Sequence, residues 1–246
     1  MTRRPLILLA VLAVVAIGGY VAYEQFLRGD EVPPLILPSA SPTGASPSAT
    51  GSSDPSSSPT GPGTQGELAG EWTVTDGSIV GYRVREKLAS LPAQSDAVGR
   101  TSDVTGAATL AASGDTVTVT AASFEADLTT LASDDGRRDR RIQQIGLESS
   151  RFPTASFTLT SPIEVPAAAL NGEAVDVTLV GDLTIHGVTT SVSIPAQARL
   201  NGDQVEVQGS LTFAFSDFGM TPPNIAGFVS AEDEATLEFL LILARP

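Results

Sequence analysis

The chain has 246 residues, of which 14 are basic and 28 acidic, so its formal net charge at pH 7 is −14. A surface of this charge repels phosphate backbones, which argues against nucleic-acid binding. The absence of Cys excludes disulfides, thiolate metal sites and a Cys nucleophile, and a single His leaves no set of imidazole ligands, so we expect no bound metal.

Residues 1–28 have the features of a transmembrane anchor. Leu6 to Tyr23 is a run of 18 residues without a charge, and a helix of that length is about 27 Å long, close to a ~30 Å hydrocarbon core. Arg3 and Arg4 precede the run and acidic residues follow it, which predicts a cytoplasmic N-terminus and an extracytoplasmic remainder. A cleaved signal peptide has the same layout, with an acceptable site at residues 16–18, so secretion is the alternative.

Residues 29–66 are predicted to be a disordered linker. From Pro38 to Gly66, 27 of 29 residues are Pro, Ser, Thr, Gly or Ala, which leaves too little apolar surface to offset the entropy of ordering. The linker separates the anchor from a single folded domain at residues 67–246.

Strand patterns with a period of two follow in chain order. They occupy residues 72–75, 79–88, 106–111, 116–128, 155–160, 175–185, 188–198, 205–215 and 235–243. These nine segments, the first of which is short, indicate about eight strands, and no long helical pattern separates them. We therefore expect an all-β fold, an antiparallel barrel or sandwich.

The clearest hairpin lies within residues 175–198. If His186 and Gly187 are the central pair of a primed turn, Leu179 faces Ile194 and nearly all apolar residues lie on one face. Both residues tolerate the left-handed backbone of such a turn, so the turn alone explains the dipeptide. This prediction places His186 at an exposed turn.

One segment between residues 129 and 153 is predicted to be helical. Ser133 is the expected N-cap, and four arginines follow within residues 137–141. The helix would lie over an opening or an edge, where Arg138, Arg141 and Ile142 are possible mouth or lid residues. Ion pairing with the nearby Asp residues is the favoured interpretation of the arginines, and an anion site is the alternative.

The sequence contains no candidate catalytic site. His186 is assigned to a turn, and the sequence has no Gly-x-Ser-x-Gly elbow, phosphate loop, dinucleotide fingerprint or metal-spaced carboxylates. We expect a protein that is not an enzyme and has no cofactor.

Several motifs occur in an order that resembles the YceI-like family. They are Trp-Thr-Val-Thr-Asp at 72–76, residues 124–130, Arg-Arg-Asp at 137–139, Arg-Phe-Pro-Thr-Ala-Ser-Phe at 151–157, Val-Gly-Asp-Leu-Thr-Ile-His-Gly-Val-Thr at 180–189 and Phe-Ser-Asp-Phe-Gly-Met at 215–220. The resemblance covers residues 71–245. It implies an exported, eight-stranded lipocalin-like barrel whose apolar interior holds a polyisoprenoid, without known catalytic activity.

The sequence also departs from the family pattern. Members commonly have a His-Ser after the opening Trp motif and a His-Leu after the Arg-Asp, whereas this chain reads Asp-Gly-Ser-Ile at 76–79 and Arg-Asp-Arg-Arg-Ile at 138–142. The contacts at the mouth or lid are therefore expected to differ from those of the family.

A barrel of about eight strands is either filled by side chains or open for one small ligand. Small inward residues favour an open interior, for which the candidate lining residues are Tyr82, Phe157, Leu183, Leu211, Phe213, Phe215 and Phe239. The expected function is an extracytoplasmic, membrane-tethered protein that binds a polyisoprenoid or similar long-chain lipid. The alternative is a structural or interaction domain with a filled barrel and no ligand.

Overall fold

The computed structural model describes residues 32–38, 68–88, 94–114, 116–222, 224–225 and 229–246. The predicted membrane span and most of the predicted linker lie outside these ranges. None of the helices within them has the length and apolar character that a membrane span requires.

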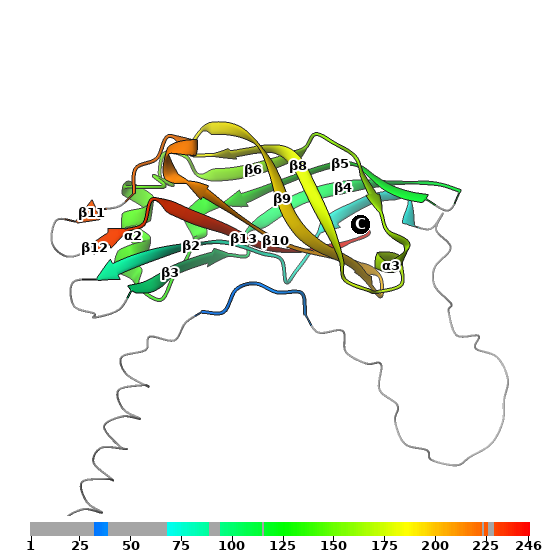
Figure 1. Cartoon of the computed structure of the whole chain (residues 1–246), viewed down its shortest axis with the longest axis horizontal. Coiled ribbons are helices and arrows are strands. Elements are labelled where there is room, and N and C mark those ends of the chain that lie inside the picture. Colours follow the sequence, from blue (N-terminus) through cyan, green and yellow to red (C-terminus); the bar gives the residue numbers. More distant parts are fainter. Residues whose placement is uncertain (1–31, 39–67, 89–93, 115, 223, 226–228) are drawn as a thin grey trace, which may run out of the picture.

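Antiparallel strands make up most of the described chain, with a few short helices between them (Figure 1). The strands are β1 Gly70–Val74, β2 Ile79–Leu88, β3 Gln94–Thr101, β4 Val104–Ser113, β5 Thr116–Asp127, β6 Thr154–Leu159, β7 Ile163–Val165, β8 Val175–Ile185, β9 Val188–Asn201, β10 Gln204–Ala214, β11 Asn224–Ile225, β12 Val229–Ala231 and β13 Glu234–Ala244. The helices are α2 Gly136–Gln144 and α3 Ala167–Leu170, with 3-10 turns η2 Leu128–Thr130 and η3 Phe215–Phe218.

The sheet closes into a barrel. Its order is β1-β4-β5-β6-β8-β9-β10-β13, and β13 pairs back to β1, which makes a ring of eight strands. Some positions in the ring are shared by two consecutive strands. Along β13, β1 and β2 pair with successive stretches of the strand. Along β5, β6 and β7 do the same, and β3 extends the position of β4 by pairing with β2. The predicted all-β, eight-stranded antiparallel barrel is therefore confirmed.

The predicted hairpin has the register that its alternation indicated. β8 and β9 pair Ile185 with Val188 and Leu179 with Ile194. His186 and Gly187 have φ angles of 53° and 74°, the left-handed values of a primed two-residue turn. Alternation on two strands and the turn residues together fixed this register.

Other local predictions need correction. β3 carries no alternating pattern, and it forms because its whole length pairs with β2. The helix α2 is capped by Asp135, whose side chain accepts a 2.7 Å hydrogen bond from the Arg137 amide, because the Ser133 hydroxyl is engaged by Asp139 at 2.6 Å. Phe215 begins the turn η3 and does not continue the strand β10.

Residues 32–38, which belong to the predicted linker, lie against the outer wall of the barrel (Figure 1). Leu35 is buried, and the carbonyl of Val32 accepts a hydrogen bond of 2.9 Å from Arg83 on β2. The sequence did not predict this contact, because a Pro-rich segment next to a low-complexity stretch has the composition of a linker.

Substitution of the turn glycine tests the β8–β9 hairpin. A Cβ at Gly187 would meet the Phe152 ring at 2.8 Å, whereas a Cβ at Gly202, which also has a positive φ, would meet nothing within 4 Å. We expect Gly202→Ala to lower the free energy of unfolding by about 1 kcal/mol through backbone strain alone, and Gly187→Ala to lower it by about 2 kcal/mol or more. Chemical denaturation of both variants measures this difference, and equal losses would show that the Phe152 contact is unimportant.

Candidate functional site

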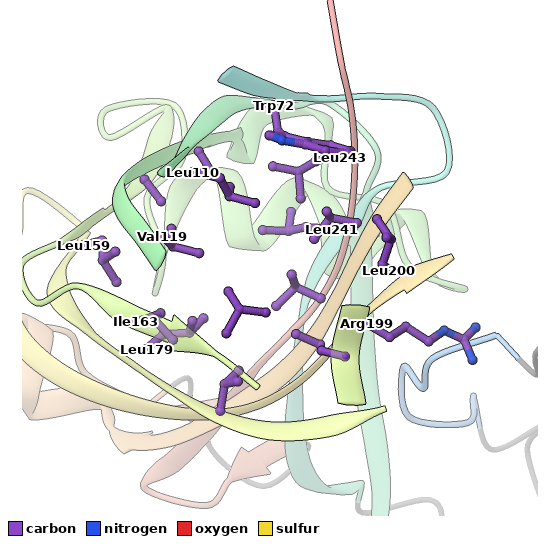
Figure 2. A pocket seen from close by; sticks show the side chains of 18 of the residues that line it. Trp72, Leu110, Val119, Leu159, Ile163, Leu179, Arg199, Leu200, Leu241 and Leu243 are labelled. Carbon is purple, nitrogen blue, oxygen red and sulfur yellow. The ribbon is translucent and has the colours of Figure 1, made fainter. Parts of the chain in front are cut away.

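The barrel interior contains an apolar cavity of about 100 Å³, which we call cavity 1. Its wall is built from inward-facing residues of many strands and from α3 (Figure 2). The labelled side chains in that view include Trp72, Leu110, Val119, Leu159, Ile163, Leu179, Leu200, Leu241 and Leu243. The lining offers a ligand no exposed polar atom, so cavity 1 suits a purely hydrocarbon group.

A second cavity of about 70 Å³, cavity 2, lies next to the first. The two share the wall residues Phe124, Phe157, Leu179 and Leu241. Along β8, Val175 lines cavity 1 and Leu183 lines cavity 2, so the pair extends along roughly 26 Å of strand at ~3.3 Å per residue. The interior is therefore elongated and only partly filled by side chains.

Glycines on the wall make room for aromatic rings. A Cβ at Gly181 would lie 2.5 Å from the Phe157 ring, and one at Gly209 would lie 2.5 Å from the Phe239 ring. Each ring therefore lies over a glycine, where a longer side chain would push it inward. The same close approach links Gly99 with Tyr82 and Gly106 with Phe124. Because the rings are accommodated at the wall, space remains near the centre of the barrel.

Trp72 forms part of the wall of cavity 1. It is 2 % exposed, and its indole Nε1–H donates a 3.0 Å hydrogen bond to the carbonyl of Leu68. The Arg245 guanidinium lies 5.3 Å from the centre of the ring system. The single polar atom of the indole is thus satisfied by the backbone, so the ring contributes only apolar surface to the cavity.

A polar group faces inward beneath α2. Arg138 pairs with Asp134, which lies just before α2, and with Glu86 of β2, the latter at 2.7 Å. Glu86 follows Tyr82 on the inward face of β2, and α2 is therefore attached to the barrel through Arg138. The predicted ion pairing of the arginines is confirmed for Arg138, and one of its partners lies on the barrel.

Tyr82 lies on the same inward face of β2 as Glu86, and its buried hydroxyl has no hydrogen-bond partner within the described residues. Burial, which outweighs the opposing charge of Arg138, raises the pKa of Tyr82 well above its ordinary value, so the phenol stays protonated. A neutral, buried O–H group is a candidate donor to the polar end of a ligand.

The seven predicted cavity residues divide into two groups. Phe157, Leu183 and Phe239 line the cavities, whereas the other four, Tyr82 among them, do not. Leu211, Phe213 and Phe215 belong to the apolar core but not to the cavity walls; Phe213 packs edge-on against Phe218 with ring centres 4.9 Å apart. On α2, Arg138 contacts the barrel, Arg141 is exposed and Ile142 is partly buried.

Several wall residues were not singled out from the sequence as ligand contacts. They include Trp72, Leu110, Val119, Ile163, Leu170 and Leu200. Their inward direction follows from strand alternation only where a strand is long, and the short β7 and α3 gave no such pattern. An inward residue borders empty space only if no aromatic ring from the opposite wall fills that space. Strand alternation gives the direction of a side chain but does not show what lies opposite it.

His186 is less exposed than its turn position predicted. Its side chain is 13 % exposed, its ring centre lies 4.3 Å from that of Phe152, and Nε2 lies 3.6 Å from Oε1 of Glu148. Within the described residues Nε2 makes no hydrogen bond, so this nitrogen is not paired with a nucleophile there. The described ranges also contain no group of three His, Cys, Asp or Glu side chains that could hold a metal ion.

A closed antiparallel barrel around an elongated apolar cavity defines the class of small barrels that enclose a ligand, of which lipocalins are an example. The family model for the YceI-like domain matches residues 72–243, and the chain belongs to this family. The family predicted from the sequence motifs is thus confirmed.

Several solved structures are similar to this chain at low sequence identity. A polyisoprenoid binding domain from Saccharophagus degradans, implicated in plant cell wall breakdown, is 18 % identical with a TM-score of 0.53, covering 72 % of this chain and 99 % of that one. BcnA of Burkholderia cenocepacia is 19 % identical with a TM-score of 0.49, covering 67 % and 95 %. The Campylobacter jejuni YceI protein is 15 % identical with a TM-score of 0.47, covering 60 % and 84 %. No curated protein matches the chain.

The unpartnered hydroxyl of Tyr82 gives a prediction for stability. Removing a buried hydroxyl that lacks a partner removes its desolvation cost, so Tyr82→Phe should raise the free energy of unfolding of the ligand-free protein by about 1 kcal/mol. Denaturant unfolding of delipidated protein measures the change. A loss of stability would show that the hydroxyl has a partner in solution.

Proposed function

We propose that this protein holds a polyisoprenoid or similar long-chain lipid inside its barrel, on the extracytoplasmic side of a membrane to which its N-terminus is anchored. The observation that carries the proposal is the pair of adjoining cavities whose exposed walls are almost entirely apolar. Membership of the YceI-like family and the fold shared with a polyisoprenoid binding domain support it.

The shape and chemistry of the interior favour a chain over a compact ligand. The cavities follow one strand from Val175 to Leu183, and only a flexible, narrow molecule occupies such a space without moving the backbone. The buried Tyr82 hydroxyl has no partner within the described residues and lies in the electrostatic field of Arg138 on α2, so a polar end of the ligand would be oriented toward that helix.

The size of the cavities requires side chains to move when a long chain binds. A cavity of about 150 Å³ holds one benzene molecule, whereas cavities 1 and 2 measure about 100 and 70 Å³. Phe124 and Phe157 lie where the two cavities meet, and we expect both rings to turn aside when a chain passes through both.

The N-terminal run of 18 uncharged residues supports the membrane-anchored location, and the charges on either side of it support the orientation. The interior offers no convergent set of polar groups for catalysis within the described residues, which favours a binding role over an enzymatic one.

A pair of neighbouring substitutions tests whether the interior binds lipid. Leu179 lines both cavities, and Val180, its neighbour, points outward and is 36 % exposed. In the full chain, Leu179→Trp should fill the cavity and remove bound lipid while Val180→Trp retains it. Native mass spectrometry of protein extracted from its host membrane would show the added mass.

Thermal unfolding of the same variants distinguishes the alternative. If Leu179 borders a cavity, the tryptophan ring of Leu179→Trp fits into open space. In a filled core, the same substitution would lower the free energy of unfolding by about 1–3 kcal/mol through overpacking. A strongly destabilised Leu179→Trp variant, together with no added mass on the parent protein, would refute lipid binding and favour a structural domain.

A further inference from the structure

A segment of the chain far from the barrel strands in sequence is bound to the barrel's outer wall. We call residues 32–38 (Val-Pro-Pro-Leu-Ile-Leu-Pro) the docking segment. Three of its backbone carbonyls accept hydrogen bonds from arginines: Val32 from Arg83 at 2.9 Å, Pro33 from Arg100 at 2.5 Å, and Pro38 from Arg199. Figure 2 shows Arg199 directed from the barrel wall toward this segment.

The docking segment lies over charges that strand alternation places on the outside of the barrel. Glu206 and Glu238 are 3 % and 4 % exposed, and Arg199 is 6 % exposed. The carboxylates pair with the same arginines that bind the segment: Arg199 with Glu206 at 2.7 Å, Arg83 with Glu238 at 2.6 Å and Arg100 with Glu238 at 3.3 Å. This part of the outer wall is thus a covered surface.

The geometry indicates that the segment crosses the strands. Arg199 lies on β9 and Arg100 on β3, and the order β9-β10-β13-β2-β3 places five strands side by side. Four spacings of ~4.8 Å amount to about 19 Å. The carbonyls that contact the two outer strands belong to Pro33 and Pro38, and the extended backbone between them covers about 17 Å at ~3.3 Å per residue. The segment therefore spans most of this distance, and the long side chains of Arg100 and Arg199 cover the rest.

The sequence of the segment suits this position. Prolines at 33, 34 and 38 provide carbonyl acceptors without N–H donors and favour an extended backbone, which lowers the entropy cost of docking. Leu35 is 8 % exposed, whereas its neighbour Ile36 is 72 % exposed. One side of the segment is therefore fixed to the barrel, and the other faces away from it.

We propose that the docking segment holds the outer wall formed by β2 and β3 close to the membrane surface; this inference rests on the membrane anchor of the proposed function. Eight residues, 24–31, separate the apolar run from Val32, and they span at most about 30 Å whatever their conformation. Without docking, residues 24–67 separate that run from the barrel, and these 44 residues can span at most about 150 Å. Docking therefore restricts the barrel to a membrane-proximal position.

Adjacent substitutions in the docking segment test this proposal in the full chain. Leu35→Asp removes a buried side chain, and Ile36→Asp introduces the same charge at the exposed neighbour. The protein has no native Cys, so a donor dye at Ser210→Cys, on the exposed side of β10, is specific. The protein is reconstituted in phosphatidylcholine vesicles that carry an acceptor lipid, and energy transfer and the rate of thermolysin cleavage within residues 32–38 are measured.

The expected result is a difference between the two variants. Leu35→Asp should raise the cleavage rate within residues 32–38 and lower energy transfer, because the maximum span of the tether rises about fivefold and its root-mean-square span as a flexible coil becomes about 35–40 Å. Ile36→Asp should keep the cleavage rate and the energy transfer of the parent. An unchanged cleavage rate in Leu35→Asp would refute docking, and faster cleavage with unchanged transfer would refute the membrane-proximal position.

Failure of the proposed function gives different results. A mature chain that begins near Gly19 and leaves the membrane would refute the anchor and, with it, this inference. Absence of lipid from the barrel, measured by mass spectrometry on the same samples, would refute lipid binding and leave the distance to the membrane unaffected.

Discussion

The pairing of β1 with β13 is the contact on which the rest of the structure depends. It joins Thr73 to Ala244 and Val74 to Leu243 and so converts an open sheet into a ring. An open sheet of this length would expose unpaired backbone at both edges and admit water to its inner face. Closure removes this pair of edges and lets the inner wall remain apolar around space that side chains do not fill.

That space is energetically unfavourable when it is empty. At ~24 cal/mol per Å³, a cavity of about 100 Å³ costs about 2 kcal/mol. The glycines beneath Phe157 and Phe239 preserve it, although an alanine at either position would move a ring inward and fill part of the void. A ligand that occupies the cavity offsets this cost and stabilises the folded state by mass action. Open space maintained at a cost in stability is consistent with a binding role.

The sequence predicted what is local and periodic. The β8–β9 register followed from two alternating strands and a His-Gly turn. The strand pattern predicted an antiparallel barrel or sandwich, and the resemblance to the YceI-like family selected the barrel. The cavity residues were predicted only in part, because inward direction does not tell whether a ring such as Phe213 packs against another ring or borders a void. β3 was missed because its stability comes from pairing with β2 rather than from its own pattern.

The docking segment was missed for a related reason, and it changes how the outer wall is understood. Acidic residues at outward strand positions ordinarily face solvent, yet Glu206 and Glu238 are almost fully buried. Buried carboxylates and guanidinium groups are tolerated when their hydrogen-bonding capacity is satisfied. The carboxylates accept from the arginines, but arginine has five donors, so further acceptors are needed. A proline-rich backbone supplies carbonyls without adding donors that would compete for the same carboxylates. The composition that made residues 32–38 resemble a linker is therefore also the composition that this charged wall binds.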